Sequence, residues 1–169
     1  MLNKKGFTLV ELLIVIVILA ILFLIVVAKV PQTLTRAKEA KTKDHLVNLR
    51  VAINNYYSTN PGFYPRDLDN EPDILNDQFI PAFIPDYMPE IPKARLRTNL
   101  GSTDSHSNKV TVIDTGTNLM VEDDITNSTK GGNRGGWIYS STTGEIRINC
   151  SKKDSRDKIY YSNYGYEEE

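Results

Sequence analysis

A single carboxylate interrupts the apolar stretch near the amino terminus. Residues 7–28 form an almost continuous apolar run in which Glu11 is the only charged side chain. This length is close to the ~20 residues with which a helix crosses a lipid bilayer. A carboxylate at membrane depth costs about 3 kcal/mol or more unless it finds a partner, so such a residue is by default a candidate for function. Glu11 is therefore the first candidate functional residue.

A partner for Glu11 can be proposed from spacing. A cut between Gly6 and Phe7 would create a new amino group four residues before Glu11, and positions four apart share one face of a helix. The ammonium and the carboxylate could then neutralise each other, within one helix or between two packed helices. The alternative is that Glu11 lies at the headgroup level of an ordinary membrane anchor and has no partner.

Residues suited to catalysis are few. Cys150 is the only cysteine, so no internal disulfide can form, and we expect it to pack as a small apolar residue rather than act as a nucleophile. His45 and His106 have no cysteine or histidine at metal-ligand spacing. The sequence therefore predicts a protein that is not an enzyme.

Two loops invite comparison with known ion-binding loops, and only the first remains a candidate. Asp114, Asp123 and Asp124 offer the hard oxygen ligands that calcium prefers, although their spacing matches no specific calcium loop and a solvated acidic turn is the alternative. The glycine-rich segment 131–136 lacks the Gly-Lys-Ser/Thr ending of a phosphate-binding loop. We predict no cofactor, with calcium as the one candidate metal.

A long helix is expected to carry the amino-terminal residues. It should run from Phe7 to about Ser58, with any kink at Pro31, which lacks a backbone donor, and should stop at the Asn-Pro-Gly of residues 60–62. We expect a membrane or assembly segment at 7–28 and an amphipathic spine at 29–58. Apolar residues at steps of three and four predict the buried stripe of that spine: Leu46, Leu49, Ile53 and Tyr56.

The remaining residues, 59–169, should form one globular domain of an α+β fold. Seven of the eight prolines lie in residues 61–92, which excludes a long helix or a central strand there. We expect a connection that packs around the spine through interleaved apolar side chains: Phe79, Ile80, Phe83, Ile84, Tyr87 and Met88.

Residues 109–149 alternate with a period of two and predict a small antiparallel sheet on the spine. One hairpin should join residues 109–113 to 118–122, and a second should join 137–140 to 145–149. In the tyrosine-rich tail, residues 152–169, we expect either contacts with a neighbouring subunit or an edge strand at 159–161.

The segment Lys4-Lys5-Gly6-Phe7-Thr8-Leu9-Val10-Glu11-Leu12-Leu13 resembles the class III leader of type IV prepilins and of type II secretion pseudopilins. The resemblance covers about thirty residues. It implies removal of residues 1–6 by a prepilin peptidase, which cleaves after Gly6 and methylates Phe7. It also implies that Glu11 contacts the amino terminus of a neighbouring subunit during assembly.

The resemblance implies a structural subunit of a homo-oligomeric helical filament, with membrane lipid and an inner-membrane assembly platform as further partners. The chain would cross the membrane once with a cytoplasmic amino terminus, then enter a periplasmic or extracellular filament. Cationic residues lie on both sides of the apolar run, so charge alone does not set this orientation. The net charge of −1 and the acidic carboxyl end argue against a nucleic-acid partner.

The kind of filament is less defined. The missing disulfide and the segment Phe63-Tyr64-Pro65-Arg66-Asp67-Leu68, which is similar to one that follows the spine helix in pseudopilins, favour a major pseudopilin. Three alternatives stay open: a type IV pilin for adhesion, motility or DNA uptake, a permanently anchored binding module, and a secreted protein cut near Ala28.

Overall fold

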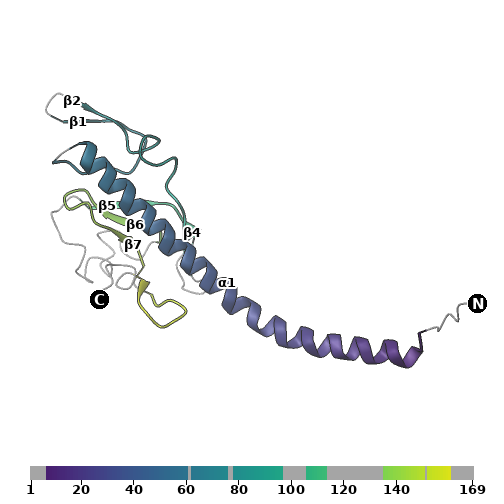
Figure 1. Ribbon diagram of the computed structural model, residues 1–169. Coiled ribbons are helices and arrows are strands. Elements are labelled where there is room, and N and C mark those ends of the chain that lie inside the picture. The colour runs from purple at the N-terminus through teal and green to yellow at the C-terminus, as the bar shows by residue number, and fades with distance from the viewer. Residues whose placement is uncertain are drawn as a thin grey trace, which may run out of the picture. The chain divides into compact units, whose positions relative to one another are not determined.

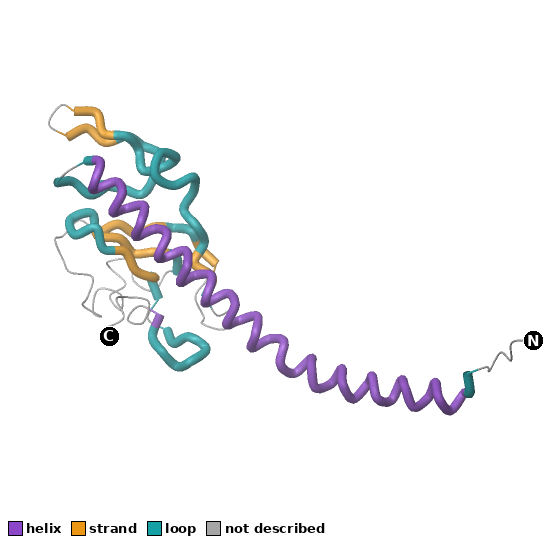
Figure 2. Tube along the Cα trace, in the orientation of Figure 1, coloured by secondary structure: helices purple, strands orange, loops and turns teal. Residues whose placement is uncertain are grey.

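The structure is a computed structural model and describes residues 7–60, 62–75, 78–96, 106–113, 135–150 and 152–160. The chain divides into two compact units, Met1–Thr35 and Arg36–Glu169. Figures 1 and 2 show the elements of each unit, which comprise one helix and seven short strands among the described residues.

The helix α1 spans Leu9–Thr59 and continues through Pro31, in agreement with the expected long helix. Its end lies where the Asn-Pro-Gly signal predicts. The backbone N–H and the side-chain amide of Asn60 both donate to the carbonyl of Tyr56, at 2.9 and 3.0 Å. Gly62 follows with a φ of 97°, a left-handed conformation that turns the chain away from the helix axis.

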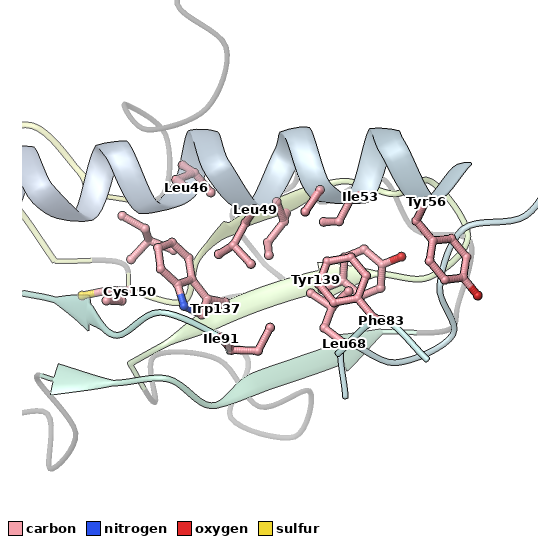
Figure 3. Packing of buried hydrophobic residues seen from close by; sticks show 14 of the residues in the cluster. Leu46, Leu49, Ile53, Tyr56, Leu68, Phe83, Ile91, Trp137, Tyr139 and Cys150 are labelled. Carbon is pink, nitrogen blue, oxygen red and sulfur yellow. The ribbon is translucent and has the colours of Figure 1, made fainter. Parts of the chain in front are cut away.

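Within the second unit, one face of α1 is buried against a sheet. The predicted stripe residues Leu46, Leu49, Ile53 and Tyr56 are each no more than 1% exposed. Figure 3 shows them in contact with Trp137 and Tyr139 from the sheet and with Phe83 from the proline-rich connection. The amphipathic spine and its apolar face are therefore confirmed.

The sheet contains β5 (Val110–Ile113), β6 (Trp137–Ser140) and β7 (Ile146–Ile148) in the order β5-β6-β7. The hairpin of β6 and β7 is antiparallel, as predicted. The expectation of a purely antiparallel sheet is wrong, because β5 pairs with β6 in parallel, Val110 opposite Trp137. The segment between Ile113 and Trp137 is long enough for the crossover that parallel strands require. The predicted strand at 118–122 lies outside the described residues.

The proline-rich connection packs as expected but also forms a hairpin that the pattern did not indicate. Short antiparallel strands occur at β1 (Asp73–Leu75) and β2 (Gln78–Ile80), and β3 (Ala94–Arg95) pairs with β4 (His106–Ser107). Most of the interleaved apolar side chains contribute to the core, as predicted. Phe79 is the exception at 72% exposed, because β2 directs alternate side chains to opposite faces and buries Ile80 instead.

Two aromatic side chains of the sheet form hydrogen bonds to this connection. The hydroxyl of Tyr139 donates to the carbonyl of Pro65, and the indole Nε1 of Trp137 donates to that of Pro92, both at 2.7 Å. Proline-flanked carbonyls have few backbone donors nearby, and a buried acceptor without a partner is costly. The two aromatic residues therefore supply both apolar area and the missing donors.

A buried carboxylate attaches the segment 152–160 to the spine. Glu39 is only 5% exposed. It accepts from the backbone N–H of Ser155 at 2.9 Å, from the hydroxyl of Ser155, and from the hydroxyl of Tyr160 at 2.8 Å. Tyr160 therefore packs within its own chain and is not available to a neighbour. Residues 161–169 lie outside the described residues, and Lys153 and Ile159 form a single antiparallel bridge.

Cys150 is buried in the same core, as predicted. Burial raises the pKa of its thiol, and the nearby Lys152 offsets this only in part. Because the thiolate is the reactive form, we expect Cys150 to react with an aromatic disulfide reagent at pH 8 at least ~10-fold more slowly in the folded chain than in urea. Rapid stoichiometric labelling of the native protein would contradict the burial of this thiol.

Candidate functional site

The first turn of α1 begins with a reciprocal pair of side chains, Thr8 and Glu11. The backbone N–H and the hydroxyl of Thr8 both donate to Oε2 of Glu11, at 2.9 and 2.8 Å. The N–H of Glu11 lies 3.2 Å from the hydroxyl oxygen of Thr8. This is the capping-box arrangement, which satisfies backbone donors that the first turn of a helix otherwise leaves unpaired.

The capping role of Thr8 was not among the sequence-based expectations, although its signal is readable. Threonine followed by glutamate three residues later, directly before an apolar run, is the capping-box pattern. Glu11 therefore has an intrachain role in addition to any role between subunits. It also sits where the positive end of the helix dipole favours a negative charge.

One oxygen of Glu11 remains available within the described segment. Both bonds from Thr8 end on Oε2, and no described donor reaches Oε1. Phe7, the residue before the cap, has a side chain that is 79% exposed. Gly6 lies outside the described residues, so the expected cleavage and methylation of this junction stay predictions.

The surface that follows the cap is apolar around its whole circumference. The large apolar side chains from Phe7 to Val27 are each between 44% and 81% exposed. By length and composition, α1 can cross a membrane. A helix that is apolar on every side is stable only when lipid or other helices surround it. Glu11 therefore stands at one end of a surface that requires a nonaqueous environment.

No group of metal-binding side chains accompanies this surface in the part of the chain that is described. It holds no group of three or more histidine, cysteine, aspartate or glutamate side chains placed to bind a metal. The candidate calcium ligands Asp114, Asp123 and Asp124 lie outside the described residues. The Nδ1 atom of His45 is 3.1 Å from the backbone carbonyl of Lys93, which is a structural contact.

One groove of about 380 Å³ occurs in the second unit beside β5. Apolar side chains and carboxylate-bearing residues line it together, among them Ile84, Val110, Asp67 and Glu90. The carboxylates do not form a metal-binding group. The groove contains no arrangement of base and nucleophile, so we assign it no reaction.

Comparison with known proteins supports the reading of the amino-terminal residues. Residues 1–27 match the family described as the prokaryotic N-terminal methylation motif. No curated protein and no solved structure matches the chain. The motif, followed by an exposed apolar helix, supports a precursor of the pilin type.

The chain thus carries a prepilin leader motif, consistent with the type IV pilin and pseudopilin family. The match ends at residue 27, within the first unit. What the second unit adds must therefore be argued from its own residues.

Proposed function

We propose that this chain is a structural subunit of a filament of the type IV pilus or type II secretion pseudopilus kind. The observation that carries the proposal is the methylation motif at residues 1–27 joined directly to a helix whose apolar surface is exposed on all sides. The partners that could cover such a surface are lipid and other copies of the same helix. A filament subunit uses both in succession.

In the membrane, lipid would surround the apolar residues 7–28. During assembly the helix would leave lipid and enter a bundle of like helices, where close packing replaces lipid contacts. Burying Glu11 in such a bundle without a partner would be unfavourable. The amino group of a neighbouring Phe7 could approach Oε1, the oxygen that Thr8 leaves unused, and so each added subunit would gain one charge pair.

The leader would be removed in the same sequence of events. We propose that a prepilin peptidase cleaves after Gly6 and that Phe7 is then methylated. An inner-membrane assembly platform would extract the mature subunit into a periplasmic or extracellular filament. This role requires no reaction at the subunit itself, and we expect no enzymatic activity.

Among filament kinds we propose a secretion pseudopilus. Three features support it. Cys150 is buried without a disulfide partner, and the sheet is small. In the Tyr-Pro segment, the backbone carbonyl of Pro65 accepts a hydrogen bond from the hydroxyl of Tyr139. In a host that carries the gene, loss of the chain should stop export of secreted proteins. Loss of adhesion, motility or DNA uptake with normal export would instead indicate a type IV pilin.

The processing step gives the direct test of the filament proposal. We expect the protein from its native membrane to begin at Phe7 and to be heavier by one methyl group, as measured by intact mass and amino-terminal sequencing. A chain that starts at Lys29 would indicate a secreted soluble protein. An intact Met1 would indicate a permanent anchor, and either result would overturn the proposal.

A further inference from the structure

The hairpin of β1 and β2 lies in the most acidic part of the second unit. Between residues 66 and 90 the sequence contains seven acidic residues and one cation, Arg66. The side chain of Glu71, at the base of the hairpin, is exposed. Figure 1 shows this hairpin toward the end of the unit at which α1 stops. We call residues 66–90 the acidic end.

The same hairpin exposes two large apolar side chains. Ile74 and Phe79 are 75% and 72% exposed, and they lie directly opposite each other in the β1–β2 register. Side chains opposite each other in an antiparallel pair share one face, so they form a single apolar patch. A large exposed apolar pair within an acidic stretch of the chain is a candidate for a surface that meets a partner.

The other end of the unit is basic. On α1, Arg36, Lys38, Lys41 and Lys43 lie within eight residues. In the segment 152–158, cations are again in excess, at Lys152, Lys153, Arg156 and Lys158. The hydrogen bonds from Ser155 and Tyr160 to Glu39 hold this segment against α1, so the two groups of cations lie near each other. We call them together the basic end.

An apolar stripe adjoins these cations on the exposed face of α1. Four exposed members recur at helical spacing: Ala37, Ala40, Val47 and Val51. The exposed Asp44 occupies the position between Ala40 and Val47 on the same face. Val47 and Val51 are 49% and 53% exposed, and they lie opposite the buried stripe of Leu46, Leu49 and Ile53. This face therefore combines small apolar side chains with flanking positive charge.

We propose that the acidic end of one copy of this chain docks on the basic end of a second copy, with Ile74 and Phe79 against the apolar stripe of α1. Each surface combines exposed apolar side chains with charged residues, and the net charges of the two surfaces are opposite. Because the two surfaces differ, the contact is head to tail, and head-to-tail contacts that do not close generate helical filaments. The inference rests on the proposed filament function and names the contact between its globular units.

A second copy fits these surfaces better than an anionic lipid headgroup does. Lipid phosphates would explain the basic end alone. They would repel the acidic end and would leave the Ile74 and Phe79 pair uncovered. A second copy of the chain accounts for the acidic end, the exposed apolar pair, the basic end and the apolar stripe of α1 together. Opposite charges across an interface also fix its register.

The test is a charge exchange in full-length protein within the host that assembles it. Glu71 and Lys41 are both exposed. We expect Glu71→Lys and Lys41→Glu each to lower the yield of sheared filaments by about tenfold or more, because each places like charges together. The double variant should restore the yield.

A second variant tests the apolar part. Because Phe79 is exposed, Phe79→Ser should leave the monomer folded and processed but lower filament yield to a similar degree. Normal filaments from all single variants would overturn this contact while leaving the filament function intact. If only Lys41→Glu lowers the filament yield and the double variant does not restore it, the basic end would be assigned to the membrane surface. This result would also overturn the proposed contact. A processed wild-type chain that never forms filaments would refute both proposals.

Discussion

Replacing Glu11 by glutamine is expected to abolish filament assembly while leaving the chain inserted in the membrane. Removing one partner of a buried charge pair costs about 3–5 kcal/mol, which lowers the equilibrium constant of each subunit addition by roughly 10²-fold to 4 × 10³-fold. Glutamine keeps a side-chain oxygen that can still accept from Thr8, so the helix start is preserved and only the charge is lost. Glu11→Ala and Glu11→Leu should fail in the same way.

The matched control is Thr8→Val, which removes the hydroxyl of the capping box but retains the carboxylate. Loss of an amino-terminal cap costs about 0.5–2 kcal/mol, so filaments should still form at reduced yield. Membrane fractionation and electron microscopy of sheared filaments would measure both outcomes. Normal filaments from Glu11→Gln would refute the charge-pair mechanism. Equal losses of filament yield from Glu11→Ala and Thr8→Val, together with normal filaments from Glu11→Gln, would assign Glu11 to capping alone.

Replacing Gly136 by alanine is expected to unfold the second unit or lower its stability by about 2–5 kcal/mol. Gly136 has a φ of 72°, which is unfavourable for any residue with a side chain. A Cβ atom there would lie 2.3 Å from the backbone carbonyl oxygen of Lys109. That same oxygen accepts the N–H of Trp137 at 2.9 Å, so the methyl group would separate β5 from β6 at the start of their parallel pair.

Gly62 offers a matched control for this substitution. Its φ of 97° is also positive, but a Cβ at Gly62 would meet nothing within 4 Å. Gly62→Ala should therefore cost only the backbone strain, about 1–2 kcal/mol. Thermal unfolding of the full-length protein in detergent micelles, followed through the single tryptophan, Trp137, would compare the two. Equal midpoints for the two variants would contradict the close approach at Gly136.

The elements that the sequence predicted correctly are those set by local chemistry. The apolar run, the helical spacing of Leu46, Leu49 and Ile53, and the stop at residues 60–62 each act within a few residues along the chain. The turn at residues 141–144 likewise predicts the β6–β7 hairpin from neighbours alone. Even Thr8 and Glu11, whose pairing was overlooked, show a local pattern three residues apart.

The features that the sequence did not reveal depend on partners far along the chain. Whether β5 pairs with β6 in parallel depends on how the connection between them returns, and no local pattern encodes that path. The burial of Glu39 depends on donors from Ser155 and Tyr160, more than a hundred residues later. The exposure of Phe79 depends on which face of β2 packs against the core.

By itself, the sequence determined the prepilin leader, the apolar helix and the carboxylate at its start, because a membrane segment is specified by the composition of consecutive residues. Only the tertiary structure decided which surfaces of the second unit remain uncovered. Most of the apolar side chains of this unit are buried against α1. The hydrogen bonds to Glu39 bring together two groups of cations that are distant in sequence. The separation of an acidic end from a basic end is therefore a property of the fold.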